Sequence, residues 1–175
     1  MFNYVKMENN ETPEKCASCG YCCKQYPGAY HPEQFDDLSK DKIIEMIKSK
    51  QYAIDAYIGY NDMRESVYNY GYFIRPFGSN EEYNKTLGQY RRYIGCVNLT
   101  EKGCALKFED RPYACQRLTS DICNSSETDS KLAIADAWSR YHSVLNDVVE
   151  ELNIQLTPYV VLNDVDDFLL GIMSL

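Results

Sequence analysis

Apolar residues recur at steps of three and four in the last third of the chain, which is the pattern of an amphipathic helix. The pattern runs from Leu132 to Leu152, and Ser126 with Asp129 forms a candidate cap ahead of it. We therefore expect one long helix in this region. Its buried face would carry Leu132, Ala135, Trp138, Tyr141, Leu145, Val148 and Leu152.

Shorter patterns predict three further elements. A helix is expected to begin near Ser39, and its apolar spacing can be continued through Ile54 and Ile58. The run Tyr72-Phe73-Ile74 favours a strand, and a last short helix is expected from Asp164 to Met173. These elements predict a mainly α chain.

A small hairpin and a short helix are expected between residues 94 and 115. The segments Ile94–Leu99 and Cys104–Phe108 flank Thr100–Gly103, which has the composition of a turn. Asp110-Arg111-Pro112 is typical of a helix start, because proline in the first turn loses no hydrogen bond. Cys115 would then lie within the first helical turns. The predicted fold class is mainly α, that is, α+β with a small hairpin.

Length and apolar content indicate one domain. A chain of 175 residues with 45% hydrophobic residues suits a single compact unit, which we expect to span residues 1–175. The apolar stretches, such as Tyr159–Leu162, are too short to cross a bilayer, and residues 1–11 do not have the pattern of a secretory leader. We expect a cytoplasmic protein that does not bind membranes.

Cysteine is the residue type that most changes this picture. The segment Cys16–Cys23 has the pattern C-x2-C-x2-C-C, and a C-x2-C turn directs two thiolates toward one metal. Eight thiols in two blocks fit two four-thiolate sites, or an iron–sulfur cluster beside a zinc ion. The predicted metal ligands are Cys16, Cys19, Cys22, Cys23, Cys96, Cys104, Cys115 and Cys123.

Disulfides are the alternative use of eight cysteines. Adjacent cysteines occur in small secreted scaffolds, and four bridges could form. The length of the chain and the overlapping C-x2-C steps favour metal over disulfides. A metal would join the two blocks across the 72 residues between Cys23 and Cys96, so its binding would contribute to folding.

The spacing does not decide between zinc and iron. Neighbouring side chains point apart, so Cys22 and Cys23 are expected to face two different sites. The C-x2-C-x2-C run is typical of bacterial ferredoxins, but their fourth cysteine is replaced here by Tyr26. We favour an iron–sulfur cluster over Zn²⁺ and retain both as candidate cofactors.

Charge is unevenly distributed. The net charge of −8 argues against nucleic acid as a partner. Residues 91–117 carry six basic and three acidic side chains, and these cations can offset the charge of thiolates. Arg111 is predicted to contribute to cofactor binding through hydrogen bonds or charge at the sulfurs, without bonding the metal; a solvated arginine is the alternative.

No other catalytic arrangement is evident. The nine glycines include no G-x-G pair, which argues against a dinucleotide fingerprint or a phosphate-binding loop. His31 is a candidate ligand or acid–base group, whereas His142 falls within the long amphipathic pattern and is expected to pack.

The cysteine pattern resembles that of the YkgJ-type cysteine-cluster proteins, which are described as chelating zinc or iron. The resemblance extends over roughly residues 16–138 and implies metal binding. It is also similar to the cysteine motif of flagellin lysine N-methylases. The segments that carry it are Cys19-Gly20-Tyr21-Cys22-Cys23, Cys96-Val97-Asn98-Leu99, Cys104, Arg111-Pro112-Tyr113-Ala114-Cys115 and Cys123.

Two classes of function follow. In the first, the metal forms a structural or redox centre of a compact, metal-centred domain, and an exposed face, such as the tyrosine-rich residues 60–95, binds a protein or peptide. In the second, an iron–sulfur cluster supports methyl transfer or redox chemistry on a peptide. Four protein ligands close a site, whereas catalysis needs an open position, so occupancy of all eight cysteines would distinguish the two.

Overall fold

The centre of the fold is a three-stranded sheet in the order β2-β1-β7. The structure is a computed structural model and describes residues 20, 23, 28–61, 66–78, 82–84, 89–91, 95–117, 128–154, 156 and 158–163. Strands β1 and β2 are antiparallel, with a register shift after Tyr57, and β7 runs parallel to β1. The strands are β1 (Tyr52–Asn61), β2 (Ser66–Pro76) and β7 (Pro158–Asn163).

Two small hairpins and several short helices complete the described part of the chain. The hairpins are β3–β4 (Glu82–Asn84, Gln89–Arg91) and β5–β6 (Leu99–Thr100, Gly103–Cys104). The α-helices are α3 (Lys40–Lys48), α4 (Tyr113–Gln116), α5 (Thr128–Ser139) and α6 (His142–Glu151). Two 3-10 turns are η1 (Pro32–Gln34) and η2 (Phe108–Asp110).

Helix α3 begins directly after Ser39, as the sequence predicts. The predicted extension of this helix through Ile54 and Ile58 is wrong. Lys50 has a φ of 56° and donates its N–H to the carbonyl of Ile47, which ends the helix in the left-handed conformation. The following segment forms β1, whose residues 53–57 are all buried, Asp55 included. A fully buried strand lacks the alternation that separates strands from helices.

The predicted long helix is two helices. A break at Arg140 and Tyr141 separates α5 from α6, and the N–H of Tyr141 donates to the carbonyl of Trp138 at 2.8 Å. The apolar spacing continues across this single turn, so Trp138 and Leu145 are both fully buried although they belong to different helices. Periodicity along the sequence does not record the change of direction.

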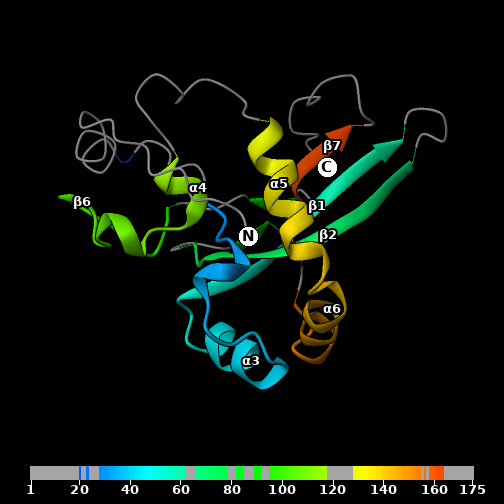
Figure 1. The fold of residues 1–175 in the computed structure, drawn as a ribbon, viewed down its shortest axis with the longest axis horizontal. Coiled ribbons are helices and arrows are strands. Elements are labelled where there is room, and N and C mark those ends of the chain that lie inside the picture. Colours follow the sequence, from blue (N-terminus) through cyan, green and yellow to red (C-terminus); the bar gives the residue numbers. More distant parts are fainter. Residues whose placement is uncertain are drawn as a thin grey trace.

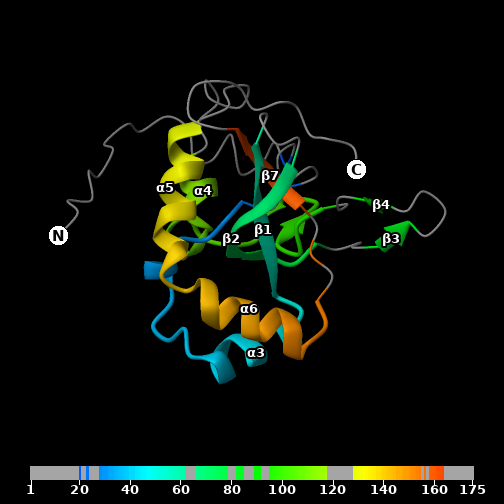
Figure 2. The ribbon, with the colours of Figure 1, turned by 90° about the vertical axis from the view of Figure 1, so that its right-hand side faces the viewer.

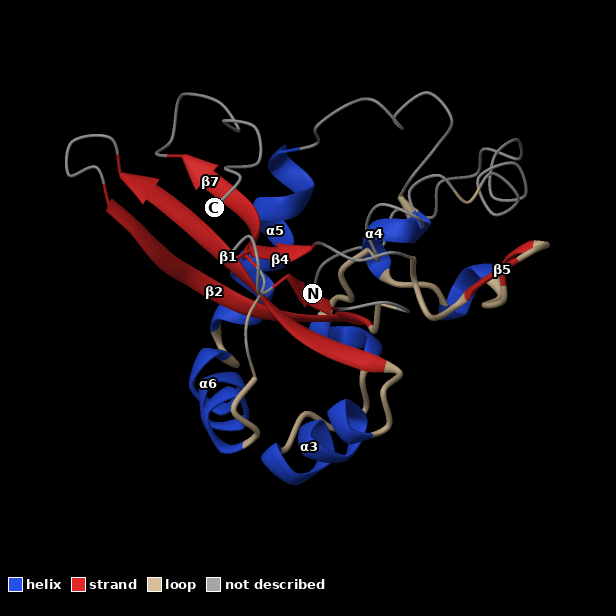
Figure 3. Cartoon of the chain, turned by 180° about the vertical axis from the view of Figure 1, so that it is seen from behind, coloured by secondary structure: helices blue, strands red, loops and turns tan. Residues whose placement is uncertain are grey.

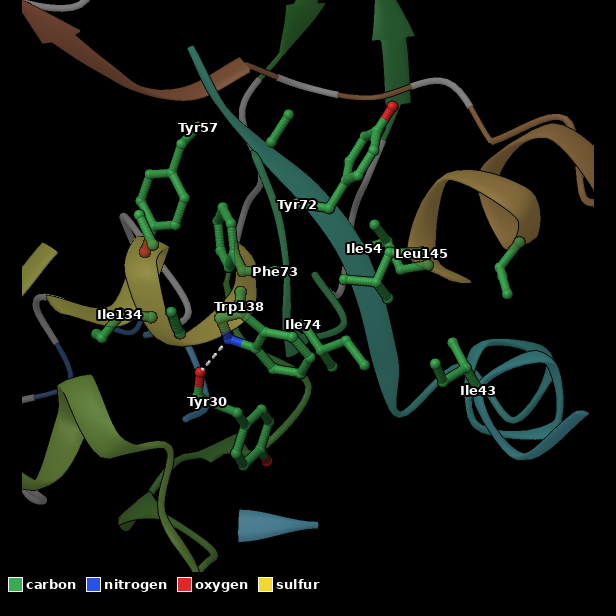
Figure 4. Close-up of a cluster of buried hydrophobic side chains, with 14 of the residues drawn as sticks. Tyr30, Ile43, Ile54, Tyr57, Tyr72, Phe73, Ile74, Ile134, Trp138 and Leu145 are labelled. Atoms are coloured by element: carbon green, nitrogen blue, oxygen red, sulfur yellow. Dashed lines mark hydrogen bonds between the residues drawn. The ribbon is translucent and has the colours of Figure 1, made fainter. Parts of the chain in front are cut away.

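The helices pack against the sheet and against one another. Helix α5 packs against β2, and α3 lies beside α6, where Lys40 and Glu151 form an ion pair of 2.8 Å (Figures 1 and 2). Seen from behind, the sheet lies in front of α5 (Figure 3). The core between these elements includes Val148 and, labelled in Figure 4, Ile43, Ile54, Tyr57, Tyr72, Phe73, Ile74, Ile134, Trp138 and Leu145.

Tyr30 joins three parts of this core. Its N–H donates to the carbonyl of Ile74 at 2.9 Å, so the segment before η1 extends along β2. Its carbonyl accepts a 2.8 Å hydrogen bond from Nε1 of Trp138, the chain's single tryptophan (Figure 4). The segment at residues 28–34 is therefore fixed to both the sheet and α5.

The architecture is α+β, as predicted, but the three-stranded sheet makes it less helical than expected. Tyr72-Phe73-Ile74 lies in β2, which confirms that strand. The apolar stretch Tyr159–Leu162, which is too short to cross a bilayer, forms part of β7. Within the described ranges, no helix has the length and apolarity needed to cross a membrane. The helix expected at 164–173 lies outside the described residues, as does the cap at Ser126.

Candidate metal centre

The structure brings the end of the first cysteine block against the second block. The N–H of Cys96 donates to the carbonyl of Cys23 at 2.8 Å, across the 72 residues that separate them. Cys96 also forms a β-bridge with Gly78, just beyond the end of β2. The second block therefore lies at the end of the sheet where β2 ends, as Figures 1 and 3 show for α4 and the β5–β6 hairpin.

The β5–β6 hairpin places Cys104. Leu99 pairs with Cys104 and Thr100 with Gly103, and the Thr100 hydroxyl donates to the carbonyl of Gly103 at 2.7 Å. Gly103 has a φ of 103°, a conformation that glycine adopts without strain. The predicted turn at 100–103 is confirmed. The strands are much shorter than predicted, and Phe108 belongs to η2 because the chain turns away from the hairpin after Cys104.

Helix α4 places Cys115. Pro112 is its N-cap, and the N–H of Cys115 donates to the carbonyl of Pro112 at 2.8 Å, so the predicted helix start is confirmed. The helix rests on the segment after the first block, because the N–H of Ala114 donates to the carbonyl of Ala29 at 3.1 Å. The backbone N–H of Gly28 donates to the sulfur of Cys115.

These four cysteines are free thiols that influence one another electrostatically. Burial, followed by the thiols of Cys96 and Cys104, raises the pKa of Cys23 to about 11. Burial also raises the pKa of Cys115, and the thiols of Cys23, Cys96 and Cys104 add to the rise. Thiolates that are partly buried beside one another require a compensating cation, and a bound metal ion supplies one.

Two arginines oppose the rise in thiol pKa that burial causes. Arg111 opposes the rise in the pKa of Cys23, and Arg75 opposes the rise in that of Cys96. Arg75 is itself buried, with 2% of its side chain exposed, and its Nε donates to Oδ2 of the fully buried Asp55 at 3.0 Å. Hydrogen bonds to sulfur act in the same direction, since the N–H of Asn98 donates to Cys96. Together these groups favour thiolate ligands.

The remaining predicted ligands, Cys16, Cys19, Cys22 and Cys123, lie outside the described residues. Among the residues that are described, no three His, Cys, Asp or Glu side chains are grouped closely enough to hold a metal ion. The described cysteines are thus neighbours without forming a closed ligand set. Metal ligation by the eight cysteines stays a prediction.

The two histidines make local capping and packing contacts. Nδ1 of His31 accepts the N–H of Glu33 at 3.3 Å and caps η1, while its ring packs on Tyr113 with 5.3 Å between centroids. Burial lowers the pKa of His31, which favours the neutral ring in this role. His142 stacks on Tyr72 at 4.8 Å, in line with the packing role predicted for it.

Sequence reasoning missed the close approach of Gly28 to Cys115. Residues 26–28 have the composition of a turn, and nothing in the sequence links them to α4. A Cβ atom at Gly28 would stand 2.5 Å from Sγ of Cys115 and 3.1 Å from its backbone nitrogen. The missing side chain allows the backbone to reach the sulfur.

We predict that Gly28→Ala weakens metal retention by at least about tenfold, because the new methyl group displaces Cys115 and its N–H···S hydrogen bond. Gly71→Ala is the matched control, since nothing lies within 4 Å of a Cβ atom at that position in β2. Metal content after dialysis against a chelator measures both. Equal retention by the two variants would contradict the proposed importance of the Gly28 contact.

One comparison with known proteins finds a match. The family model CxxCxxCC, described as "Putative zinc- or iron-chelating domain", matches residues 15–135. The matched residues contain all eight cysteines and Arg111. No curated protein and no solved structure matches the chain.

Proposed function

Because the chain belongs to the CxxCxxCC family of zinc- or iron-chelating domains, we propose that it binds its metal through all eight cysteines. The observation that carries the proposal is the meeting of the two blocks, where Cys23 lies against Cys96 and shares an electrostatic environment with Cys104 and Cys115. Four free thiols from distant segments thus influence one another, with Cys96 buried and the other three partly buried.

The residues fit a thiolate-bound metal. Sulfur ligands suit both Zn²⁺ and iron–sulfur clusters, and N–H···S hydrogen bonds with nearby arginines stabilise the negative charge of either. Adjacent cysteines direct their side chains apart, so Cys22 and Cys23 would serve two sites. We place iron–sulfur ahead of zinc, because the C-x2-C-x2-C run at Cys16–Cys22 is typical of cluster binding.

The proposed role is a structural or redox centre in a single metal-centred domain that binds a protein or peptide. The metal would hold the β5–β6 hairpin and α4 beside the end of the sheet. The described residues in this region form short loops and single turns. A cytoplasmic location is part of the proposal, since a reducing compartment keeps eight thiols available to metal.

Metal analysis of the anaerobically purified protein tests this function. We expect stoichiometric zinc or iron, and visible absorption that bleaches on reduction if an iron–sulfur cluster is present. A colourless protein with zinc alone would overturn the preference for iron. A folded protein without metal, with eight thiols that all titrate, would overturn the proposed function.

Arg111 provides a second test. Its Nε donates to the carbonyl of Leu106 at 3.3 Å, and its guanidinium lies 5.7 Å from the centre of the Phe108 ring. These contacts hold the guanidinium in place. Its charge lowers the pKa of Cys23, and we propose that it does not bond the metal. Arg111→Lys keeps the charge and loses the planar donors, so we expect metal retention to weaken or the reduction potential to shift.

Lys107 supplies the control for Arg111, because it is an exposed cation in the same basic segment. Lys107→Ala should leave metal content and potential unchanged. If Arg111→Lys and Arg111→Ala both match the parent in metal content, stability and potential, Arg111 has no role at the sulfurs.

A further inference from the structure

Gln34 connects the segment that follows the first cysteine block to the turn that carries Cys115. It is the last residue of η1, and its half-buried amide makes three hydrogen bonds. Its Oε1 accepts the backbone N–H of His31 at 2.9 Å and that of Tyr113 at 2.7 Å. Its Nε2 donates to the carbonyl of Arg111 at 2.8 Å. One side chain therefore forms hydrogen bonds with the residues before and after Pro112.

These contacts supply what α4 lacks at its start. The first N–H groups of a helix have no partner within the helix, and a side-chain oxygen usually satisfies one of them. The N-cap of α4 is Pro112, whose side chain has no oxygen. Gln34 satisfies the N–H of Tyr113, the first helical residue, from 79 positions earlier in the chain. It acts as the missing cap.

The turn held in this way carries two groups of the metal centre. Arg111 lies on one side of Pro112, and Cys115 lies in the single turn of α4 on the other. The carbonyl of Arg111 also accepts a hydrogen bond from Nε2 of Gln116 at 2.9 Å, so two amides hold it. A four-residue helix is too short to keep its own position, and its orientation depends on such contacts.

The segment that carries Gln34 is anchored to the core. Residues 28–34 are tied to β2 through the N–H of Tyr30 and to α5 through Trp138, at 2.9 and 2.8 Å. Gln34 is therefore connected to the core through this segment.

We infer that Gln34 is a positioning residue of the metal centre, which fixes the Arg111–Cys115 turn so that sulfur and guanidinium face the metal together. The inference rests on the proposed function. Groups that orient metal ligands typically change metal affinity 10–100-fold when removed. A role confined to stability would leave the geometry of the bound metal unchanged.

Two substitutions separate the three hydrogen bonds. Gln34→Leu removes all of them. Gln34→Glu keeps an acceptor for the N–H of Tyr113 but, as a carboxylate, has no proton to donate to the carbonyl of Arg111. Gln51→Leu is the matched control, because Gln51 is an exposed glutamine at the entry to β1.

Anaerobic titration of the metal-free full-length chain with Co²⁺ is the test. Its thiolate-to-cobalt absorption reports the number of bound sulfurs, which a purely structural role would not alter. We expect Gln34→Leu to bind about 10–100-fold more weakly, with less of this absorption per cobalt, Gln34→Glu to fall between it and the parent, and Gln51→Leu to match the parent.

The outcomes distinguish this inference from the proposed function. If the parent binds Co²⁺ and both Gln34 variants match it in affinity and absorption, Gln34 has no positioning role and the metal site stands. If Gln34→Leu fails to fold, the cobalt affinity and absorption of Gln34→Glu decide the question in the same way. A parent that binds no Co²⁺ through sulfur, and that also contains no zinc or iron after anaerobic purification, would overturn the inference and the proposed function together.

Discussion

Trp138→Ala is expected to lower the free energy of unfolding by about 3–5 kcal/mol, the range for removing a large buried aromatic side chain. Trp138 is fully buried between the sheet and α5, and its ring contacts Phe35 and Tyr141 with centroid separations of 6.1 and 5.8 Å. The substitution also removes the donor to the carbonyl of Tyr30. Chemical denaturation of the metal-loaded protein measures the loss.

Trp138→Phe separates packing from the hydrogen bond. It keeps an aromatic ring but leaves the buried carbonyl of Tyr30 without this donor, so we expect a smaller loss of about 1–3 kcal/mol. Ser143→Ala, on the exposed side of α6, should change stability by less than about 0.5 kcal/mol. If Trp138→Ala behaves like Ser143→Ala, the core described around α5 is wrong.

Cys115→Ser is expected to empty the site that this cysteine serves, because a hydroxyl is a poor replacement for a thiolate ligand of zinc or an iron–sulfur cluster. Metal per chain should fall by the content of one site. For a ligand present at 100 times its Kd, loss of binding also removes about 2.7 kcal/mol of apparent stability.

Ala105→Ser is the control for this substitution, since it introduces a hydroxyl at an exposed position next to Cys104. It should leave metal content and the unfolding midpoint unchanged. Metal content measured by atomic emission, with thermal unfolding before and after chelation, reads both effects. A Cys115→Ser protein with the metal content of the parent would remove Cys115 from the ligand set.

The parts of the site that follow from local chemistry could be predicted from the sequence. Proline after Asp110 and Arg111 marks the start of α4, and the composition of residues 100–103 marks a turn. The cysteine spacing led us to expect the two blocks to meet, and Cys23 does lie against Cys96. Each of these features depends on a few neighbouring residues or on the shared chemistry of thiols.

The parts that depend on long-range packing could not be predicted. Gln34 satisfies a helix start 79 residues away, and Gly28 matters because Cys115 occupies the space of its missing side chain. The buried pair of Asp55 and Arg75 looks like two surface charges in the sequence, because charged side chains are seldom buried. Strand β1 is also hard to recognise, because its consecutive buried residues lack the alternation of a half-buried strand.

X-ray absorption spectroscopy of the anaerobically purified protein tests metal ligation by the cysteines, because it identifies the atoms bonded to the metal. We predict a nearest shell of sulfur, at about 2.3 Å for zinc or for the iron of a cluster. A nearest shell made only of nitrogen and oxygen at about 2.0–2.2 Å would contradict it, because the eight cysteines would then not be the ligands.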